Sequence, residues 1–351
     1  MPGFKFHEFF AGSGLVGRGL APYFTTVWAN DINEIKANVY RANLDGRVLD
    51  VGDIADVSGK NLPAAELSWA SFPCQDLSVA GKINGIDAKR SGLVWQWLRI
   101  IDELGGQAPK VVCLENVSGL VSSHKGEDYR RLHRALVSRG YRTGAFLLNA
   151  SRFVPQSRPR IFVVGTRGLI PEGLVGDGPT WLHPPSVVKA ADALDDFVWW
   201  HADAPRSRRL RLSDVIEDAP FDHDDVIRLI PAAHIAKFEK SGLRYATAYK
   251  RTRDHRQVLE LRCDGLAGCL RTPAGGSSRQ YIVANRDGEL HARLLTVRET
   301  ARLMGAPDDY VLPGSYNDGY FAMGDAVVAP VAHWLAKTFL YKLVEAAYHE
   351  K

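Results

Sequence analysis

The chain has little cysteine and no cysteine pattern of the kind that binds zinc or builds a disulfide framework. Its 351 residues include four cysteines, Cys74, Cys113, Cys263 and Cys269, and no Cys-x-x-Cys pair. It also lacks internal repeats, low-complexity tracts, a signal-peptide pattern and any apolar run long enough to span a membrane. We therefore expect a reduced, cytoplasmic protein that needs neither a metal nor a membrane.

The charge is modest overall but unevenly distributed. The formal net charge is +4, and arginine outnumbers lysine by 30 to 14. Residues 192–225 carry ten acids against four arginines, whereas residues 237–286 carry eleven lysines and arginines against four acids. Arginine-rich surface suits bidentate contact with phosphates and guanine edges. Ordinary solvated surface is the alternative, but nucleic acid is the first partner to test.

Short apolar runs alternate with amphipathic stretches over the first 168 residues. The alternation predicts strands at 4–9, 25–30, 67–72, 110–115, 142–149 and 160–166, and helices at about 14–22, 33–43, 91–104 and 127–139. Such a pattern indicates an α/β fold with a doubly wound, mostly parallel, Rossmann-like sheet covered on both faces.

The alternation ends near residue 170, where proline, tryptophan, acid clusters and basic runs take over. The organisation that we predict has three parts, which are a first domain at 1–169, a smaller and irregular second domain at 170–290, and a segment at 291–351 that returns to the first. Thr296 and Glu299 form a capping box before a helical pattern, and a longer helix is predicted at about 329–348.

A glycine-rich turn follows the first predicted strand. Gly12, Gly14 and Gly17 fit the Gly-x-Gly-x-x-Gly pattern, in which small residues let a ligand approach the backbone. Asp31 closes the next strand, where an acid would hold ribose hydroxyls; the alternative is a helix N-cap. Asp53 follows another strand end and could read an adenine edge. The pattern indicates an adenosine-containing cofactor, either a nicotinamide dinucleotide or S-adenosylmethionine.

A cysteine stands at a stiff corner after a buried apolar run. The run at 67–72 ends at Pro73, which fixes its own φ and holds the preceding residue extended. Cys74 follows at a strand terminus, where open α/β sheets place their active sites. The alternative is a small buried hydrophobe. Hydride transfer needs no covalent nucleophile, so the cysteine favours the methyl donor over the dinucleotide.

Charged residues mark the ends of two further predicted strands. Glu115 follows an apolar run, and a buried carboxylate with a raised pKa can donate a proton or a hydrogen bond to a ring nitrogen. Arg158 and Arg160 are two residues apart, so on a strand they point the same way and could meet one substrate. The alternatives are a glutamate satisfied by backbone donors and arginines that contact phosphates or carboxylates at the surface.

Together these residues resemble the cytosine-C5 DNA methyltransferase family, in order as well as in content. The motifs in chain order are FAGSG at 10–14, NDI at 30–32, GDI at 52–54, FPCQDLS at 72–78, DAKRSGL at 87–93, ENV at 115–117, QSRPR at 156–160, RLLTVRETARLMGAPDDY at 293–310 and MGDAVVAPVA at 323–332. Only about 170–265 lies outside the resemblance.

The resemblance implies roles for four residues. Cys74 would be the nucleophile that adds to C6 of a cytosine flipped out of the duplex. Glu115 would hold the N3/N4 edge of that base. Arg158 and Arg160 would bind its carbonyl oxygen and steady the catalytic loop. The implied cofactor is S-adenosylmethionine, and the implied substrate is double-stranded DNA.

The resemblance also implies two binding surfaces. The residues expected to line the methyl donor are Phe10, Ala11, Gly12, Ser13, Gly14, Leu15, Asp31, Ile32, Asp53, Ile54, Pro73, Leu93, Asp325 and Val327. The residues expected to contact DNA are Gln75, Ser78, Arg90, Arg271, Ser277, Ser278 and Arg279. By its position, 170–290 resembles the family's target-recognition domain.

Three positions depart from the family pattern. Cys269 precedes Leu270 where the family usually has threonine, and Leu15 stands where a second glycine is common. Asp325 replaces the usual asparagine near the amino-acid end of the donor. We predict that this negative charge weakens S-adenosylmethionine binding and that Asp325→Asn tightens it.

The sequence thus predicts an enzyme that methylates cytosine C5 in a specific duplex DNA sequence. We expect a monomer that serves as the partner of a restriction endonuclease, or as a stand-alone modifier, in a bacterium or a phage-infected cell. One alternative is an RNA (tRNA) cytosine methyltransferase, against which the sizeable basic region argues. The other is a non-catalytic DNA-binding relative, against which the presence of all four implied catalytic residues argues.

Overall fold

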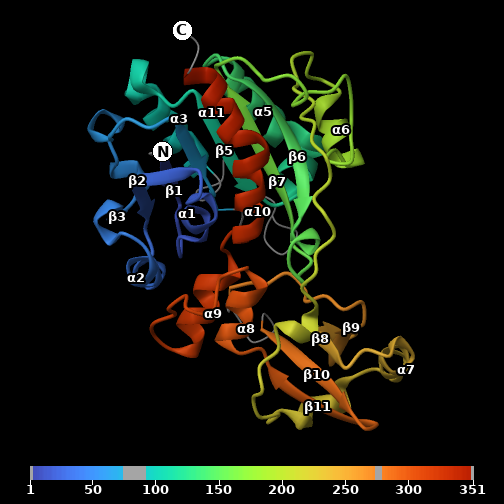
Figure 1. Ribbon diagram of the computed structural model, residues 1–351. Coiled ribbons are helices and arrows are strands. Elements are labelled where there is room, and N and C mark those ends of the chain that lie inside the picture. Colours follow the sequence, from blue (N-terminus) through green and yellow to red (C-terminus); the bar gives the residue numbers. More distant parts are fainter. Residues whose placement is uncertain (1–2, 74–91, 273–278, 349–351) are drawn as a thin grey trace.

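The computed structural model describes residues 3–73, 92–272 and 279–348. Figure 1 shows an upper lobe built on a large sheet and a lower lobe built on a small sheet, with the chain crossing from one to the other and back. The predicted site residues that lie outside the described ranges are Cys74, Gln75, Ser78, Arg90, Ser277 and Ser278.

The large sheet has seven strands in the order β3-β2-β1-β4-β5-β7-β6. They are β1 (Phe4–Phe9), β2 (Phe24–Asp31), β3 (Leu49–Val51), β4 (Leu67–Ala70), β5 (Val111–Asn116), β6 (Arg142–Asn149) and β7 (Pro159–Thr166). Strand β7 is antiparallel to both of its neighbours, and the four remaining pairs are parallel. The predicted α/β fold with a doubly wound, mostly parallel sheet is confirmed.

Helices cover both faces of this sheet. In β5, Val111 and Cys113 point into one apolar core and Val112 and Leu114 into the other, as the two-residue repeat of a strand requires. The first face is covered by α1 (Leu15–Leu20), α10 (Ala329–Leu335), the π-helical turn η9 (Ala336–Leu340) and α11 (Tyr341–Tyr348). The second face is covered by α3 (Leu93–Leu104), α4 (Gly119–Ser122), α5 (Glu127–Val137) and α6 (Pro185–Ala191).

The remaining helices and turns complete the two lobes. The helices among them are α2 (Glu34–Asn43), α7 (Ala232–Ser241), α8 (Val297–Leu303) and α9 (Tyr316–Gly324). The 3-10 turns are η1 (Gly46–Val48), η2 (Ile54–Asp56), η3 (Gly59–Asn61), η4 (Gly105–Gln107), η5 (Ser123–Gly126), η6 (Ala150–Arg152), η7 (Leu212–Asp214) and η8 (Asp224–Leu229). Over the described ranges, no helix is both long enough and apolar enough to cross a membrane.

Most strands of the large sheet lie close to their predicted positions, and β1 and β6 coincide with them. Strand β3 is the strand end that was expected before Asp53; its three residues are too few to show a repeat, so no bounds were predicted for it. The predicted capping box is confirmed, since Thr296 and Glu299 exchange hydrogen bonds at the start of α8. The predicted C-terminal helix is α10, η9 and α11 in succession.

The lower lobe contains a four-stranded antiparallel sheet in the order β11-β10-β8-β9. Its strands are β8 (Tyr245–Arg253), β9 (Arg256–Arg262), β10 (Gln280–Arg286) and β11 (Glu289–Leu294). Two-residue turns with positive φ, Asp254-His255 and Asp287-Gly288, close its two hairpins. The sequence predicted an irregular region here, because the basic residues at the ends of β8 and β9 leave only a short apolar pattern in each strand.

The small sheet has an apolar core of its own, whereas the segment before it packs on the large sheet. Phe238 and Val283 belong to the core of the small sheet. Leu174 and Trp200 belong to the core of the large one, and Trp200 Nε1 lies 3.2 Å from the carbonyl oxygen of Gly144 in β6. The chain therefore leaves the upper lobe well after residue 170.

Candidate active site

The glycine-rich turn after β1 leaves space beside its backbone. Phe10, Gly12 and Gly14 have φ values of 58°, 57° and 80°. A positive φ is strained for a bulky residue such as Phe10, and such strain clusters at functional sites. Within the described structure, a Cβ added to Gly12 would meet no heavy atom closer than 3.9 Å, which is the distance to the Lys36 side chain. This side of the turn has room for a ligand.

Asp31, at the end of β2, holds the turn. Its Oδ2 accepts the Gly12 N–H at 2.8 Å, and its Oδ1 accepts the Asn33 N–H at 2.8 Å. Burial raises the pKa of Asp31, and the Lys36 ammonium opposes that rise. The N-cap of α2 is Asn33, so the alternative role of Asp31 as the cap is wrong. Each carboxylate oxygen keeps a lone pair with which a ligand hydroxyl can bond.

The other residues predicted to line the cofactor differ in what they offer a ligand. Ile32 is 69% exposed, and the exposed carboxylate of Asp53 caps η2. In contrast, Leu15 lies in the core of the large sheet, and Ser13 Oγ donates to the Ala322 carbonyl at 3.2 Å. The residues that are buried or half-buried are Ala11, Ile54, Pro73, Leu93 and Val327. In the described part of the chain, no three His, Cys, Asp or Glu side chains are placed to hold a metal ion.

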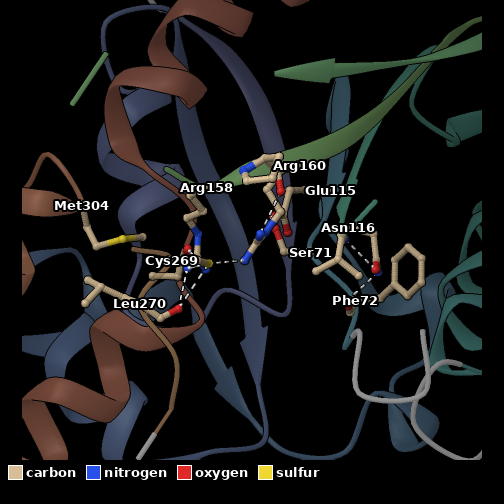
Figure 2. A network of polar contacts seen from close by, with 12 residues as sticks. Ser71, Phe72, Glu115, Asn116, Arg158, Arg160, Cys269, Leu270 and Met304 are labelled. Atoms are coloured by element: carbon tan, nitrogen blue, oxygen red, sulfur yellow. Dashed lines mark hydrogen bonds and ion pairs between the residues drawn. The ribbon is translucent and has the colours of Figure 1, made fainter. Parts of the chain in front are cut away.

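Figure 2 shows Glu115 beside Arg160, where β5 and β7 are neighbours. Arg160 Nε lies 2.9 Å from Glu115 Oε1, and Glu115 is 6% exposed. Burial raises the pKa of Glu115, although Arg160 and Arg158 oppose the rise. The glutamate is thus held by a guanidinium rather than only by backbone donors, and a carboxyl group with a raised pKa can donate a hydrogen bond as well as accept one.

Arg158, just before β7, is 2% exposed and joins separate segments of the chain. Its Nη1 donates to the Leu270 carbonyl at 2.9 Å and to the Gly324 carbonyl at 3.1 Å. Its Nη2 donates to the Ala326 carbonyl at 2.8 Å. These contacts hold the segment before β10 and the end of α9 against the upper lobe (Figure 2).

Cys269 is the point where the two arginines meet. Its Sγ lies 3.4 Å from Arg158 Nη1 and 3.8 Å from Arg160 Nη2. Burial would raise the pKa of the Cys269 thiol, but Arg158 and Arg160 outweigh burial and hold that pKa below its ordinary value. Both guanidinium groups therefore reach one place, as their spacing predicted.

The end of β4 is tied to the residue after Glu115. Asn116 Nδ2 donates to the Phe72 carbonyl at 3.0 Å, as Figure 2 shows. Strands β4 and β5 are parallel neighbours, so their carboxyl ends meet at the same edge of the sheet. Cys74 comes two residues after Phe72 in the sequence and lies outside the described residues.

Gln156 belongs to this network, although no role was predicted for it. The side chain is buried; its Nε2 donates to the Leu303 carbonyl at 2.8 Å, and its Oε1 accepts the Leu270 N–H at 3.0 Å. The next residue, Ser157, donates its N–H to the Ala267 carbonyl at 2.9 Å. The sequence could have pointed to Gln156, because it is an amide next to the arginine motif. A buried amide needs hydrogen-bond partners.

A second unpredicted contact links α2 to the last motif. Lys36 Nζ lies 2.6 Å from Asp325 Oδ2, although the two residues are 289 positions apart. The prediction that Asp325 weakens donor binding took no account of this counter-ion. No local pattern signals this pair, because neither residue has its partner nearby in the sequence.

Two of the arginines predicted to contact DNA are described, and they differ. Arg271 is exposed. Arg279 lies against α9, where its guanidinium donates to Asn317 and is 5.7 Å from the centre of the Tyr316 ring. Arg271 is therefore the better placed of the two to meet a ligand.

Comparison with known proteins decides the family. A sequence model of the family described as C-5 cytosine-specific DNA methylase matches residues 4–340. The chain belongs to this family. Type II methyltransferase M.Bsp6I from Bacillus sp. (strain RFL6) is 27% identical over 95% of this chain and 97% of that protein. Type II methyltransferase M.HhaI from Haemophilus parahaemolyticus is 27% identical over 96% of this chain and 94% of that protein.

Solved structures share the fold of this C-5 cytosine methylase. S. pombe Dnmt2 methyltransferase has a TM-score of 0.61 at 18% identity, covering 95% of this chain and 98% of that one. A putative DNA modification methyltransferase encoded within a prophage (E. coli) has a TM-score of 0.59 at 19% identity, covering 98% and 99%. The predicted family and activity are confirmed, and DNA is favoured over the RNA and non-catalytic alternatives. Methyltransferases of this family generally use S-adenosylmethionine.

Proposed function

We propose that this methylase transfers a methyl group from S-adenosylmethionine to C5 of a cytosine flipped out of duplex DNA, with Cys74 as the nucleophile. The observation that carries the proposal is the buried contact between Glu115 and Arg160, at 2.9 Å. The Phe72 carbonyl is bound to Asn116, next to this contact. Cys74 follows Phe72 by two residues in the sequence.

Glu115 would hold the cytosine by its N3 and N4 edge. Because burial raises the pKa of Glu115, the carboxyl group can be protonated when the base arrives. It can then donate to N3 and accept from the exocyclic amine. Donation to N3 draws electron density from C6 and makes that carbon more electrophilic. Arg160, which touches the same carboxyl group, would bind the carbonyl oxygen of the base.

Arg158 would position the site rather than contact the base. Its guanidinium is already bound to the carbonyls of Leu270, Gly324 and Ala326. The sequence assigned both arginines to the base. The geometry favours a division in which Arg160 meets the substrate and Arg158 fixes the segments around it.

The reaction needs a covalent step because C5 of an aromatic cytosine is a poor nucleophile. Addition of the Cys74 thiolate to C6 converts the ring to an enamine-like species whose C5 is nucleophilic. A free thiol has a pKa of about 8.5, so nearby arginines are needed to favour the thiolate. Bound S-adenosylmethionine supplies an electrophilic methyl group. Loss of the C5 proton to water and elimination of Cys74 restore the aromatic ring.

The glycine turn fits the nucleoside part of the methyl donor. The backbone at Gly12 has room beside it, and Asp31 has carboxylate lone pairs for ribose hydroxyls. Ile32 exposes an apolar side chain of the kind that would cover an adenine face, and Asp53 exposes an acceptor. We therefore assign these residues to the donor, and we assign Ser13 and Leu15 to the support of the turn.

The lower lobe would recognise the DNA sequence. We place this recognition domain at about 217–324 instead of 170–290, because Trp200 donates to the Gly144 carbonyl in the large sheet, whereas the Glu217 N–H donates to Glu299 of α8 in the lower lobe. The former boundary at 290 also falls inside β11. Arg253 and Arg256 are exposed on the small sheet, where they can meet phosphates.

The named relatives also indicate the biological setting. M.Bsp6I and M.HhaI are Type II methyltransferases. We propose that this chain acts as a monomer in a bacterial cytoplasm, where its methyl mark protects DNA from a companion endonuclease. Bisulfite sequencing of DNA from cells that express the protein identifies the modified cytosine and its sequence context.

A duplex with 5-fluorocytosine at that position then tests the mechanism. Fluorine cannot leave as a proton does, so wild-type protein and cofactor should give an adduct that survives denaturing electrophoresis. Cys74→Ser should give none. Cys269→Ser is the matched control, since Cys269 is another thiol beside the arginines, and it should keep the adduct. An adduct that persists in Cys74→Ser and disappears in Cys269→Ser would reassign the nucleophile.

A further inference from the structure

Four arginines stand together in a stretch of the chain that is otherwise acidic. Residues 192–225 carry ten acids, and their only arginines are Arg206, Arg208, Arg209 and Arg211. This run lies between Trp200, which bonds to the large sheet, and Glu217, whose N–H donates to Glu299 in the lower lobe. It therefore belongs to the part of the chain that crosses from the upper lobe to the lower lobe, and the proposed methyl transfer gives it no role.

Two of these arginines line a hollow of about 370 Å³ beside η6. The residues around it are Ser151, Arg152, Pro205, Arg206, Ser207 and Arg208. None of them is acidic, and within the described ranges no aspartate or glutamate forms an ion pair with its three arginines. Asp214, a nearby acid in the sequence, instead accepts the Arg211 N–H at 2.7 Å. The hollow thus gathers three positive charges that have no counter-ion in the described part of the chain.

Two of the three guanidinium groups are held in place by neighbours. The guanidinium carbon of Arg152 lies 4.6 Å from the centre of the Trp181 ring. Arg208 Nε donates to the Ser151 carbonyl at 3.1 Å, and its Nη1 donates to the Leu210 carbonyl. A guanidinium group has five N–H donors, so each of these arginines keeps further donors for an oxygen anion.

The open side of the hollow supplies additional donors. Arg206 and Ser207 are exposed, and neither side chain has a hydrogen bond to another residue of the described ranges. Arginine binds phosphate oxygens through paired N–H groups, and a hydroxyl group can donate to the same oxygens. Three guanidinium groups and two hydroxyl groups around one space are therefore suited to a phosphate.

The hollow lies on the same edge of the large sheet as Glu115. Strand β7 is antiparallel to both β5 and β6, so β5 and β6 end at the same edge, which faces the lower lobe in Figure 1. Asn149 Oδ1, at the end of β6, accepts the Ser151 N–H at 3.1 Å and the Arg158 N–H at 3.0 Å. Ala150 follows and lines the small cavity that Glu115 also lines. A duplex that delivers a base to Glu115 therefore comes close to the hollow.

We propose that this hollow binds a backbone phosphate of the DNA duplex, at a position outside the recognised base pairs. A free anion such as inorganic phosphate has the same chemistry. The place of the hollow, on the chain crossing between the base site and the small sheet, favours the duplex. Such a contact adds affinity and fixes the register of the protein on DNA without reading a base. The inference rests on the proposed function, because it assumes a duplex at Glu115.

Replacement of single phosphates by neutral methylphosphonates tests the proposal. Each duplex carries the target sequence that bisulfite sequencing identifies and one methylphosphonate. S-adenosylhomocysteine, the product of the methyl donor, takes the place of the donor so that no transfer occurs during the titration. Wild-type protein should lose affinity about fivefold at the phosphate that enters the hollow, which is the scale of one exposed charge-assisted contact. In the double variant Arg152→Gln, Arg206→Gln that one loss should fall below about twofold, while the losses at other positions remain.

The double variant Arg209→Gln, Arg211→Gln is the matched control. Both arginines are exposed members of the same run, and neither lines the hollow. The control removes the same charge and should keep the wild-type loss at every position. If Arg152→Gln, Arg206→Gln does not fold, Arg206→Gln alone gives the comparison, because that side chain is exposed.

Three results would overturn the proposal. Wild-type losses at every position in Arg152→Gln, Arg206→Gln would mean that the hollow holds no DNA phosphate, and calorimetric binding of inorganic phosphate would then assign it to a free anion. Disappearance of the same loss in the control would assign the effect to the general charge of the run. Wild-type protein that binds no duplex would remove the proposed function as well, whereas wild-type protein that methylates DNA with an unchanged scan would remove this inference alone.

Discussion

The large and small sheets differ in where they place charged side chains. In and beside the large sheet, Glu8, Glu115 and Arg158 are buried. On the small sheet, Arg253 and Arg256 are exposed. A buried charge is costly unless partners of fixed geometry surround it, whereas an exposed charge needs no fixed partner and is screened by salt. The buried charges of the upper lobe are therefore held at defined positions, as is the buried pair of Arg293 and Glu299 in the lower lobe, whereas the exposed arginines of the β8–β9 hairpin are interchangeable.

This contrast suits the two tasks that we propose. Methyl transfer requires donors and acceptors within fractions of an ångström of the reacting base, which favours buried and fully bonded groups. Contact with DNA phosphates requires positive charge over an area, which favours exposed arginines. Substitutions in the two lobes should therefore have different consequences.

The largest effect is expected at Glu8, in the middle of the large sheet. Glu8 Oε1 accepts the Gly17 N–H at 3.1 Å, and among the described residues Oε2 has no hydrogen-bond partner. Burial raises the pKa of Glu8 from 4.5 to about 8, while the bond from Gly17 opposes the rise. The unfolded chain therefore loses this proton at a lower pH than the folded protein does, so the group costs stability as the pH rises from about 4.5 to about 8.

Glu8→Gln should remove this fall in stability with rising pH. We expect the variant to gain on the order of 4 kcal/mol in unfolding free energy relative to wild type between pH 5 and pH 9, as a pKa difference of this size implies. Urea denaturation of both proteins at several pH values measures it. Glu34→Gln, an exposed control, should follow the wild-type profile, and parallel profiles for Glu8→Gln would show that Glu8 is not the titrating group.

A smaller effect is expected at Arg158. Lysine has one ammonium in place of a planar guanidinium, so it cannot bind Leu270, Gly324 and Ala326 together. We expect Arg158→Lys to lower the free energy of unfolding by about 3 kcal/mol and, because the site shifts, to lower kcat about 100-fold. Denaturant titration and single-turnover methylation measure the two effects.

Arg262→Lys is the matched control for Arg158→Lys. Arg262 lies on β9 of the small sheet and pairs with Asp264 at the surface, so its replacement should change stability by less than about 0.5 kcal/mol. If Arg158→Lys and Arg262→Lys lowered the free energy of unfolding equally, the distinction between the buried arginine of the upper lobe and the surface arginine of the lower lobe would be wrong.

The smallest effect on stability is expected at Arg253 and Arg256. Their replacement by glutamine should leave the free energy of unfolding within about 0.5 kcal/mol of wild type. It should weaken DNA binding at low salt and lower the slope of log Kd against log salt by about one for each phosphate that is no longer neutralised. Fluorescence anisotropy with a labelled duplex measures the slope, and an unchanged slope would move the DNA surface away from these arginines.

The sequence predicted the upper lobe better than the lower one. Strand β1 alternates phenylalanine with polar residues and β6 contains the apolar run Ala145–Leu148, and either pattern indicates a strand without knowledge of its neighbours. In the small sheet, β8 ends in a group of basic residues and β9 begins and ends with arginine, so both strands have only a short apolar pattern. The motif residues Asp31 and Glu115 could also be located from the sequence, because each stands at the end of a strand that the local pattern predicts.

Local sequence was sufficient to predict the family, the main sheet and the order of the charged motifs, because each depends on residues close together in the chain. The three backbone carbonyls bound by Arg158, the contact of Arg160 with Glu115, and the pairing of Asp325 with Lys36 became clear only from the folded chain. Arg158 contacts residues more than 100 positions away, and Lys36 and Asp325 are 289 apart. Such contacts depend on how the lobes pack, and no local pattern of residues encodes them.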